Sequence, residues 1–163
     1  MMSKILFVCT GNICRSSSAE AVLRRLIKEA RLSGRIVVDS AATTDAYIGR
    51  PPDHRALNAA TKRGYDLSNC VARQVLAEDF LEFDLILCMD WENMLWLQQR
   101  CPPLYHHKLM LLMRFATDHV EACVPNPQEG GPEAFNKVLV LLEDACKGVL
   151  EIAKRRLSQH EAA

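Results

Sequence analysis

A buried strand that breaks into a compact loop and then a helix is the feature that most constrains this fold. Residues 5–8 (Ile-Leu-Phe-Val) form a continuous apolar run, typical of a strand covered on both faces. The run ends at residues 9–12 (Cys-Thr-Gly-Asn), and helical spacing follows over 17–30, where Ser17 and Glu20 have the form of a capping box. Strand, tight loop and helix together predict the opening unit of an α/β sheet.

The same alternation recurs along the chain. The apolar patterns predict further strands at 36–38, 85–89 and 109–113 and helices at 53–63, 91–100 and 132–158. Strands that alternate with helices form a mostly parallel sheet covered on both faces. The sequence has no internal repeat, low-complexity tract or linker, so we expect residues 1–163 to form a single domain.

Composition and charge narrow the class of protein. The chain is 49% hydrophobic and 25% charged, the balance of an ordinary soluble domain with a sizeable core. Twenty basic residues cancel twenty acidic ones, so there is no overall basic field to attract nucleic acid or an acidic membrane. No apolar run reaches the roughly 18 residues that span a bilayer. We therefore expect no nucleic-acid partner and no membrane partner.

Seven cysteines are the unusual part of the composition. An odd count without a secretory leader favours a reducing, cytoplasmic location over a disulfide scaffold. Cys88 and Cys146 stand at apolar positions and are predicted to be core, whereas Cys101 and Cys123 are predicted loop or helix-end thiols. The sequence has no Cys-x-x-Cys pair and its five histidines lack ligand spacing, so we expect neither a metal nor another cofactor.

The loop after the first strand carries the chemistry. In an open α/β sheet, ligands bind at the carboxyl ends of the strands, where the N–H groups of a loop and a helix start cradle an anion. The same donors stabilise a thiolate at Cys9, Arg15 supplies a fork for two phosphate oxygens, and Ser16 can donate to the sulfur. In the alternative interpretation, Cys9 only ends a strand and Arg15 is solvated. The spacing Cys-x5-Arg-Ser between strand and helix disfavours that alternative.

In this loop and in several later segments, the chain resembles the low-molecular-weight protein tyrosine phosphatases. The matching stretches are 8–17 (VCTGNICRSS), 39–43 (DSAAT), 49–50 (GR), 72–74 (ARQ), 83–90 (FDLILCMD) and 124–127 (VPNP). The resemblance implies a flavodoxin-like fold, with three α/β/α layers around a four-stranded parallel sheet. It also implies metal-free hydrolysis of phosphomonoesters, such as a phosphotyrosine protein or a small aryl phosphate, through a phosphocysteine intermediate.

The resemblance assigns roles within and around the loop. It implies that Cys9 is the nucleophile, Arg15 the phosphate clamp and Ser16 a stabiliser of the thiolate. The phosphate-binding residues that it implies are Thr10, Gly11, Asn12, Ile13, Cys14 and Arg15. Asn12 and Ser40 would hold the loop in its strained form. Asp90, directly after the strand at 85–89, is predicted either to fix the loop or to cap the next helix.

Asn126 is the most consequential departure from the family pattern. Relatives place an Asp before this Pro as the general acid, whereas an amide can form a hydrogen bond but does not surrender a proton at neutral pH. The exchange is either a natural loss of activity or an engineered change, and the intact Val-Pro-x-Pro frame favours the second. Asp118, Glu121 and Glu129 lie nearby in sequence as substitute acids. We expect a chain that binds phosphate esters and turns over slowly.

The predicted substrate rim departs from the family as well. Gln128 and Glu129 stand where relatives carry aromatic residues, and Ala46 replaces a bulky ring. The adjacent Tyr47 is either a replacement for that ring or an exposed aromatic without a role. Ile13 favours an aryl ester over phosphoarginine, because phosphoarginine enzymes carry a smaller polar residue there.

The other cysteines raise the questions of a redox role for the loop and of a function other than a phosphatase. Cys14 lies five residues after Cys9, so it can capture an oxidised Cys9 as a disulfide, or it is a small buried residue that shapes the loop. A thiol-dependent arsenate reductase would need Cys88 and Cys101 as a relay. A phosphate-recognition module without turnover is the third possibility. We expect a monomer or a weak homodimer.

Overall fold

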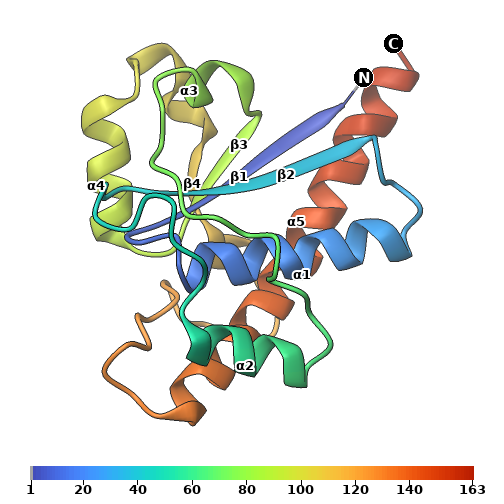
Figure 1. The fold of residues 1–163 in the computed structure, drawn as a ribbon. Helices are drawn as coiled ribbons and strands as arrows, with labels where there is room; N and C mark the ends of the chain where they lie inside the picture. The colour runs from blue at the N-terminus through green and yellow to red at the C-terminus, as the bar shows by residue number, and fades with distance from the viewer. Residues whose placement is uncertain (1) are drawn as a thin grey trace.

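One parallel sheet organises the protein. The computed structural model describes residues 2–163. The strands β1 (Ser3–Cys9), β2 (Ile36–Ala42), β3 (Leu85–Cys88) and β4 (Leu109–Leu111) lie in the order β2-β1-β3-β4, and every neighbouring pair is parallel. This arrangement confirms the predicted four-stranded parallel sheet and places β1 between two partners (Figure 1).

Helices cover both faces of the sheet, which gives the predicted three layers. The helices are α1 (Arg15–Glu29), α2 (His54–Lys62), α3 (Asp79–Glu82), α4 (Trp91–Arg100) and α5 (Pro132–Glu161), with short 3-10 helices at Pro103–Lys108 and Leu112–Phe115. α1 and α5 pack against one face, α3 and α4 lie on the other, and α2 packs on α5 beyond the sheet (Figure 1). Within residues 2–163, none of the helices combines the length and apolar composition that a membrane crossing requires.

The side chains of β1 divide between two cores. Ile5 and Phe7 belong to the core that contains α1 and α5, whereas Leu6 and Val8 belong to the core beneath α3 and α4. All four side chains are completely buried, as the apolar run predicted. Full burial of such a side chain is worth about 1.5–3 kcal/mol. The strand that ends in Cys9 is therefore anchored from both faces.

The start of α1 corrects one prediction. The helix begins at Arg15, two residues before the predicted start, and the capping box at Ser17 and Glu20 is wrong. The Ser17 hydroxyl donates to the carbonyl of Cys14, while Glu20 accepts from Arg24 and Cys70. Among residues 2–163, no side chain forms a capping hydrogen bond at the start of α1. Its first N–H groups are therefore available to an anion rather than bound to a capping side chain.

The carboxyl ends of β2 and β4 differ from their predicted positions by two residues or more. β2 continues from Ile36 to Ala42, beyond the predicted 36–38, because it pairs with β1 along its whole length although Asp39 and Ser40 are polar. β4 ends at Leu111, and residues 112–113 turn into a 3-10 helix. The extension of β2 has a functional consequence, since it delivers Ser40 to the loop after β1.

Candidate active site

The loop between β1 and α1 is held by the side chain of Asn12. Asn12 has a left-handed backbone, with φ of 57°, a conformation that costs non-glycine residues free energy. Its Nδ2 donates to Ser16 Oγ at 2.8 Å and to Ser40 Oγ at 2.9 Å. Its Oδ1 accepts from the backbone N–H of Arg73 at 3.1 Å. Three hydrogen bonds from α1, β2 and a distant loop thus fix this strained position.

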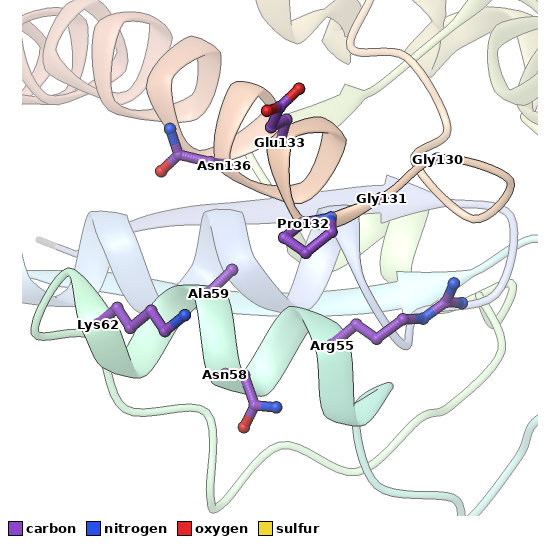
Figure 2. Close-up of a pocket in the computed structure, with 9 residues that line it drawn as sticks. All are labelled: Arg55, Asn58, Ala59, Lys62, Gly130, Gly131, Pro132, Glu133 and Asn136. Atoms are coloured by element: carbon purple, nitrogen blue, oxygen red, sulfur yellow. The ribbon is translucent and has the colours of Figure 1, made fainter.

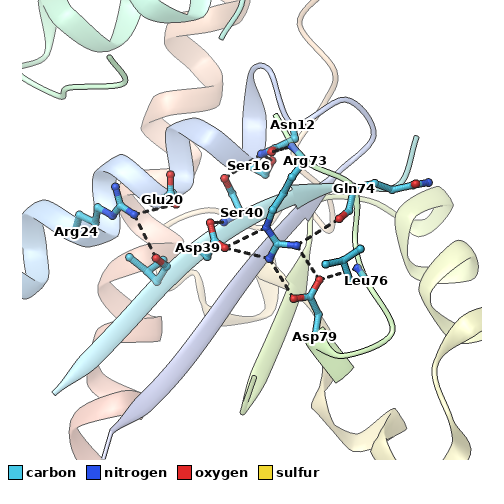
Figure 3. A network of polar contacts seen from close by, with 11 residues as sticks. Asn12, Ser16, Glu20, Arg24, Asp39, Ser40, Arg73, Gln74, Leu76 and Asp79 are labelled. Atoms are coloured by element: carbon cyan, nitrogen blue, oxygen red, sulfur yellow. Dashed lines mark hydrogen bonds and ion pairs between the residues drawn. The ribbon is translucent and has the colours of Figure 1, made fainter. Parts of the chain in front are cut away.

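Arg73 links the hydrogen bonds of Asn12 to two carboxylates, a role that the sequence did not predict. Its guanidinium lies between Asp39, at 3.0 Å, and Asp79, at 2.9 Å (Figure 3). Asp39 immediately precedes Ser40 on β2, and Asp79 begins α3. The tripeptide Ala-Arg-Gln belongs to the matching stretches of the sequence, but no local pattern indicates which carboxylates its arginine would meet.

Cys9 ends β1 with its sulfur inside the loop. Its side chain is 3% exposed, its Sγ lies 3.1 Å from Ser16 Oγ, and it accepts from the N–H of Asn12 at 3.3 Å. Because Ser16 Oγ already accepts from Asn12 Nδ2, the hydroxyl proton of Ser16 is free for the sulfur. The three side chains form a chain of donors that ends on the thiol.

Arg15 is buried beside the loop and is held in one orientation. Its guanidinium is 4% exposed and donates to Asp90 Oδ2 at 2.7 Å and to the carbonyl of Val124 at 2.9 Å. The other carboxylate oxygen of Asp90 accepts from the N–H of Asn93 at 2.9 Å and caps α4. The two contacts of Asp90 that we considered as alternatives thus occur together. The sequence did not predict the contacts of Val124 and Asn93. Val124 contributes only its backbone carbonyl, and Asn93 contributes its backbone N–H in the first turn of α4.

A cavity of about 130 Å³ opens above these groups. Its lining consists of Cys9, Thr10, Gly11, Ile13, Cys14, Arg15, Tyr47, Asn126 and Gln128. Tyr47 lies over the loop, since a Cβ at Gly11 would come within 3.1 Å of its ring. The other two predicted rim residues, Ala46 and Glu129, do not line this cavity. The structure therefore gathers most of the predicted site but not the whole rim.

The position expected for a general acid is occupied by an amide. Asn126 lines the cavity, and its Oδ1 accepts from the N–H of Gln128 at 3.3 Å. Arg55 donates to the carbonyl of Gln128 at 2.9 Å, which ties this segment to α2. The hydrogen bond from Arg55 holds the pKa of Asp53 below its usual value. In the part of the chain that the structure describes, no carboxylate lines the cavity, and Glu121 is instead paired with Lys137.

A larger cavity lies away from this chemistry. About 460 Å³ is enclosed between α2 and the start of α5, with Arg55 and Lys62 on one wall and Glu133 and Asn136 on the other (Figure 2). It contains no thiol and none of the predicted catalytic residues. Within residues 2–163, no cluster of three His, Cys, Asp or Glu side chains is arranged to hold a metal ion. We therefore place the site at the smaller cavity.

The remaining cysteines are mostly buried. Burial, followed by the neighbouring Cys9, raises the pKa of Cys14 to about 12, so it is a protonated thiol at neutral pH. Burial, followed by Asp90, raises the pKa of Cys88 to about 12. Cys88 is fully buried and Cys101 is 5% exposed. A relay through these two thiols, as an arsenate reductase would need, has no exposed sulfur to present to a reductant.

A thiol at the carboxyl end of a parallel strand, inside a loop that ends in a buried arginine, is the arrangement expected of a phosphatase with a cysteine nucleophile. Comparison with known proteins gives the same answer. The family model described as low molecular weight phosphotyrosine protein phosphatase matches residues 4–160. The chain belongs to this family.

Relatives match along nearly the whole chain. A protein of Synechocystis that carries the name of a low molecular weight protein-tyrosine-phosphatase is 43% identical over 148 residues, which cover 90% of this chain and 94% of that protein. The human low molecular weight phosphotyrosine protein phosphatase is 38% identical and covers 91% of this chain and 94% of its own length. The crystal structure of a protein tyrosine phosphatase from Entamoeba histolytica, with Hepes in the active site, has a TM-score of 0.91 and 37% identity, and the match covers 94% and 97% of the two chains.

Proposed function

We propose that this protein hydrolyses aryl phosphate monoesters, phosphotyrosine among them, through a phosphocysteine at Cys9, and that Asn126 slows its turnover. One observation carries the proposal. The cavity that joins the Cys9 thiol and the Arg15 guanidinium is lined by an amide at the place where a proton donor is required.

The attack on phosphorus needs only the loop. The Cys9 thiolate attacks phosphorus, the S–P bond forms as the ester P–O bond breaks, and the electron pair of that bond leaves with the ester oxygen. Loop N–H groups and Arg15 hold the three equatorial oxygens while charge redistributes. The hydrogen bonds from Ser16 and Asn12 to sulfur support the thiolate, and Asp90 keeps the guanidinium in place. All of these groups are present.

Departure of the leaving group, in that same transfer step, lacks its acid. A departing phenolate has a conjugate acid with a pKa of about 10, as for tyrosine, and a positioned acid contributes about 10²–10⁴-fold to such a step. Asn126 can donate a hydrogen bond to the leaving oxygen but not a proton. Hydrolysis of the phosphocysteine by water then lacks a base at the same position. Turnover is therefore slow, and slowest for esters with poor leaving groups.

The walls of the cavity fit an aryl ester. Ile13 and Tyr47 provide apolar and aromatic surface beside the loop. The Entamoeba relative has Hepes, a sulfonate with a tetrahedral sulfur, in its active site. The cytoplasmic location is supported by the seven cysteines, all of them free thiols. A monomer or a weak homodimer is expected, and sedimentation at several protein concentrations distinguishes the two.

Hydrolysis of two esters tests the proposal. p-Nitrophenyl phosphate releases a phenolate that needs little protonation, whereas phenyl phosphate needs a proton. We expect Cys9→Ser to abolish both reactions, and Asn126→Asp to raise kcat at least tenfold for phenyl phosphate and by a smaller factor for p-nitrophenyl phosphate. Asn58→Asp, which adds the same charge to an exposed position on α2, is the matched control. No gain from Asn126→Asp for phenyl phosphate would remove Asn126 from the acid position.

The alternative favoured by Asn126 is a module that recognises phosphate without turnover. A pre-steady-state experiment with p-nitrophenyl phosphate in excess separates the two. A burst of p-nitrophenol, one equivalent per chain, followed by slower steady release supports the enzyme. Phosphate binding without any burst supports the recognition module.

A further inference from the structure

The hydroxyl of Thr10 is held from behind by a buried amide. Asn93 Nδ2 donates to Thr10 Oγ1 at 3.1 Å. Asn93 is 1% exposed and lies in the first turn of α4, while Thr10 lines the cavity between Cys9 and Gly11. This contact joins the start of the loop to a helix more than 80 residues further along the chain. A buried amide with one donor committed to a hydroxyl fixes that hydroxyl's direction.

A hydroxyl that accepts a hydrogen bond still has its own proton to donate. Among residues 2–163, the Thr10 Oγ1 makes only the hydrogen bond that it accepts from Asn93, so its proton has no partner there. The side chain lines the same cavity as the Cys9 thiol and as Arg15, whose guanidinium is suited to an oxyanion.

We propose that the Thr10 hydroxyl donates to an oxygen of the bound phosphoryl group, and that Asn93 is the positioning residue that turns the hydroxyl proton toward that oxygen. This inference rests on the proposed function, because it adds a side-chain donor to the same phosphate site. It is distinct from the backbone N–H groups of the loop, which any sequence could supply.

The position of Asn93 is itself fixed by the arginine clamp. Asp90 accepts from the N–H of Asn93 with one oxygen and from Arg15 with the other. The first turn of α4 thus orients both the guanidinium at one end of the loop and the hydroxyl at the other. Within residues 2–163, Asn93 Oδ1 is buried without a hydrogen-bond partner, and the contact with Thr10 is made by the amide N–H.

Two substitutions isolate the proton. Thr10→Val keeps the shape of the side chain and removes the hydroxyl, whereas Thr10→Ser keeps a hydroxyl. Asn93→Asp replaces the donor with a carboxylate of the same shape that can only accept, so the Thr10 proton turns away from the cavity. The readout is the affinity of inorganic phosphate, measured by isothermal titration calorimetry on the full chain, with thermal unfolding of each variant as a check of folding.

We expect Thr10→Val to weaken phosphate binding about ten- to hundredfold, the loss typical of a hydrogen bond to a charged group, and Thr10→Ser to recover most of it. We expect Asn93→Asp to weaken binding strongly in the original chain and much less in the Thr10→Val background. Thr61→Val and Asn58→Asp, at exposed positions on α2, are matched controls that should bind phosphate unchanged.

Two results would overturn the inference. Unchanged phosphate affinity in Thr10→Val means that the hydroxyl does not reach the anion. An equal loss from Asn93→Asp with and without the Thr10 hydroxyl means that the carboxylate acts through its charge alone. Failure of the proposed function has a different signature: no p-nitrophenol burst from the original chain, with the Thr10→Val effect on phosphate binding intact.

Discussion

The contact between Arg15 and Asp90 makes a quantitative prediction. Arg15 is 4% exposed and Asp90 24% exposed, so removing the carboxylate leaves a nearly buried cation with only the Val124 carbonyl as an acceptor. Breaking a buried ion pair costs about 3–5 kcal/mol, and the partial exposure of Asp90 favours the lower end of that range. Asp90→Ala also loses the cap of α4, worth about 1 kcal/mol.

The total for Asp90→Ala is therefore about 4 kcal/mol, which lowers the Tm by about 8–16 °C in a chain of this length. Asp90→Asn keeps a good cap and a neutral acceptor for Arg15, and its loss is about 1.5 kcal/mol, or about 3–6 °C. Differential scanning calorimetry measures both. Phosphate should restore part of the lost Tm, because the anion pairs with Arg15 in the folded state only.

Glu92→Gln is the matched control, since Glu92 is an exposed acid in the same turn of α4. It should change the unfolding free energy by no more than about 0.5 kcal/mol. If Asp90→Ala destabilises the protein no more than Glu92→Gln does, the account of Arg15 as a buried cation dependent on one carboxylate is incorrect.

Three further predictions each concern one residue. Asn12→Gly suits the left-handed backbone but loses three hydrogen bonds, so calorimetry should detect a folded chain with weaker phosphate binding. Thiol reductant should restore more activity after peroxide in the original chain than in Cys14→Ser, because the Cys14 thiol of the same loop can trap oxidised Cys9 as a disulfide before it is oxidised further. Burial alone would raise the pKa of Asp144, but hydrogen bonds from Thr117, His119 and Asp118 lower it to about 2. Its stabilisation should therefore be present above pH 4 and vanish toward pH 2, and Asp144→Asn should flatten the dependence of Tm on pH over that window.

The sequence predicts the parts of the fold that local patterns determine. β1 and α4 are recognisable because a doubly buried strand and an amphipathic helix leave clear apolar spacing. The end of β2 is not recognisable, because the polar residues Asp39 and Ser40, whose side chains contact Arg73 and Asn12, interrupt the apolar pattern. The capping box predicted at Ser17 and Glu20 is wrong for a related reason. The loop leads directly into α1 at Arg15, so Ser17 already lies inside the helix.

The residues of the candidate site likewise fall into those that the sequence predicts and those that it does not. Its central residues are contiguous, so Cys9, Arg15 and the loop between them are visible as one motif. Arg73 and Asn93 are not visible in this motif, because they contact the loop from distant segments. The backbone N–H of Arg73 donates to Asn12, and the side-chain amide of Asn93 donates to Thr10. No periodicity or spacing in the sequence encodes such contacts, and only the packed sheet brings them together.

The partners of Arg15 have a consequence for how the protein is made. Asp90 lies 75 residues from Arg15 and Val124 lies 109 residues from it. A nascent chain that has not yet emerged past Val124 cannot hold the guanidinium in its final orientation, however well β1 and α1 have formed. Affinity for phosphate should therefore appear late during synthesis and refolding, once these long loops have closed. Phosphate binding is thus a marker of the completed fold rather than of its first βα unit.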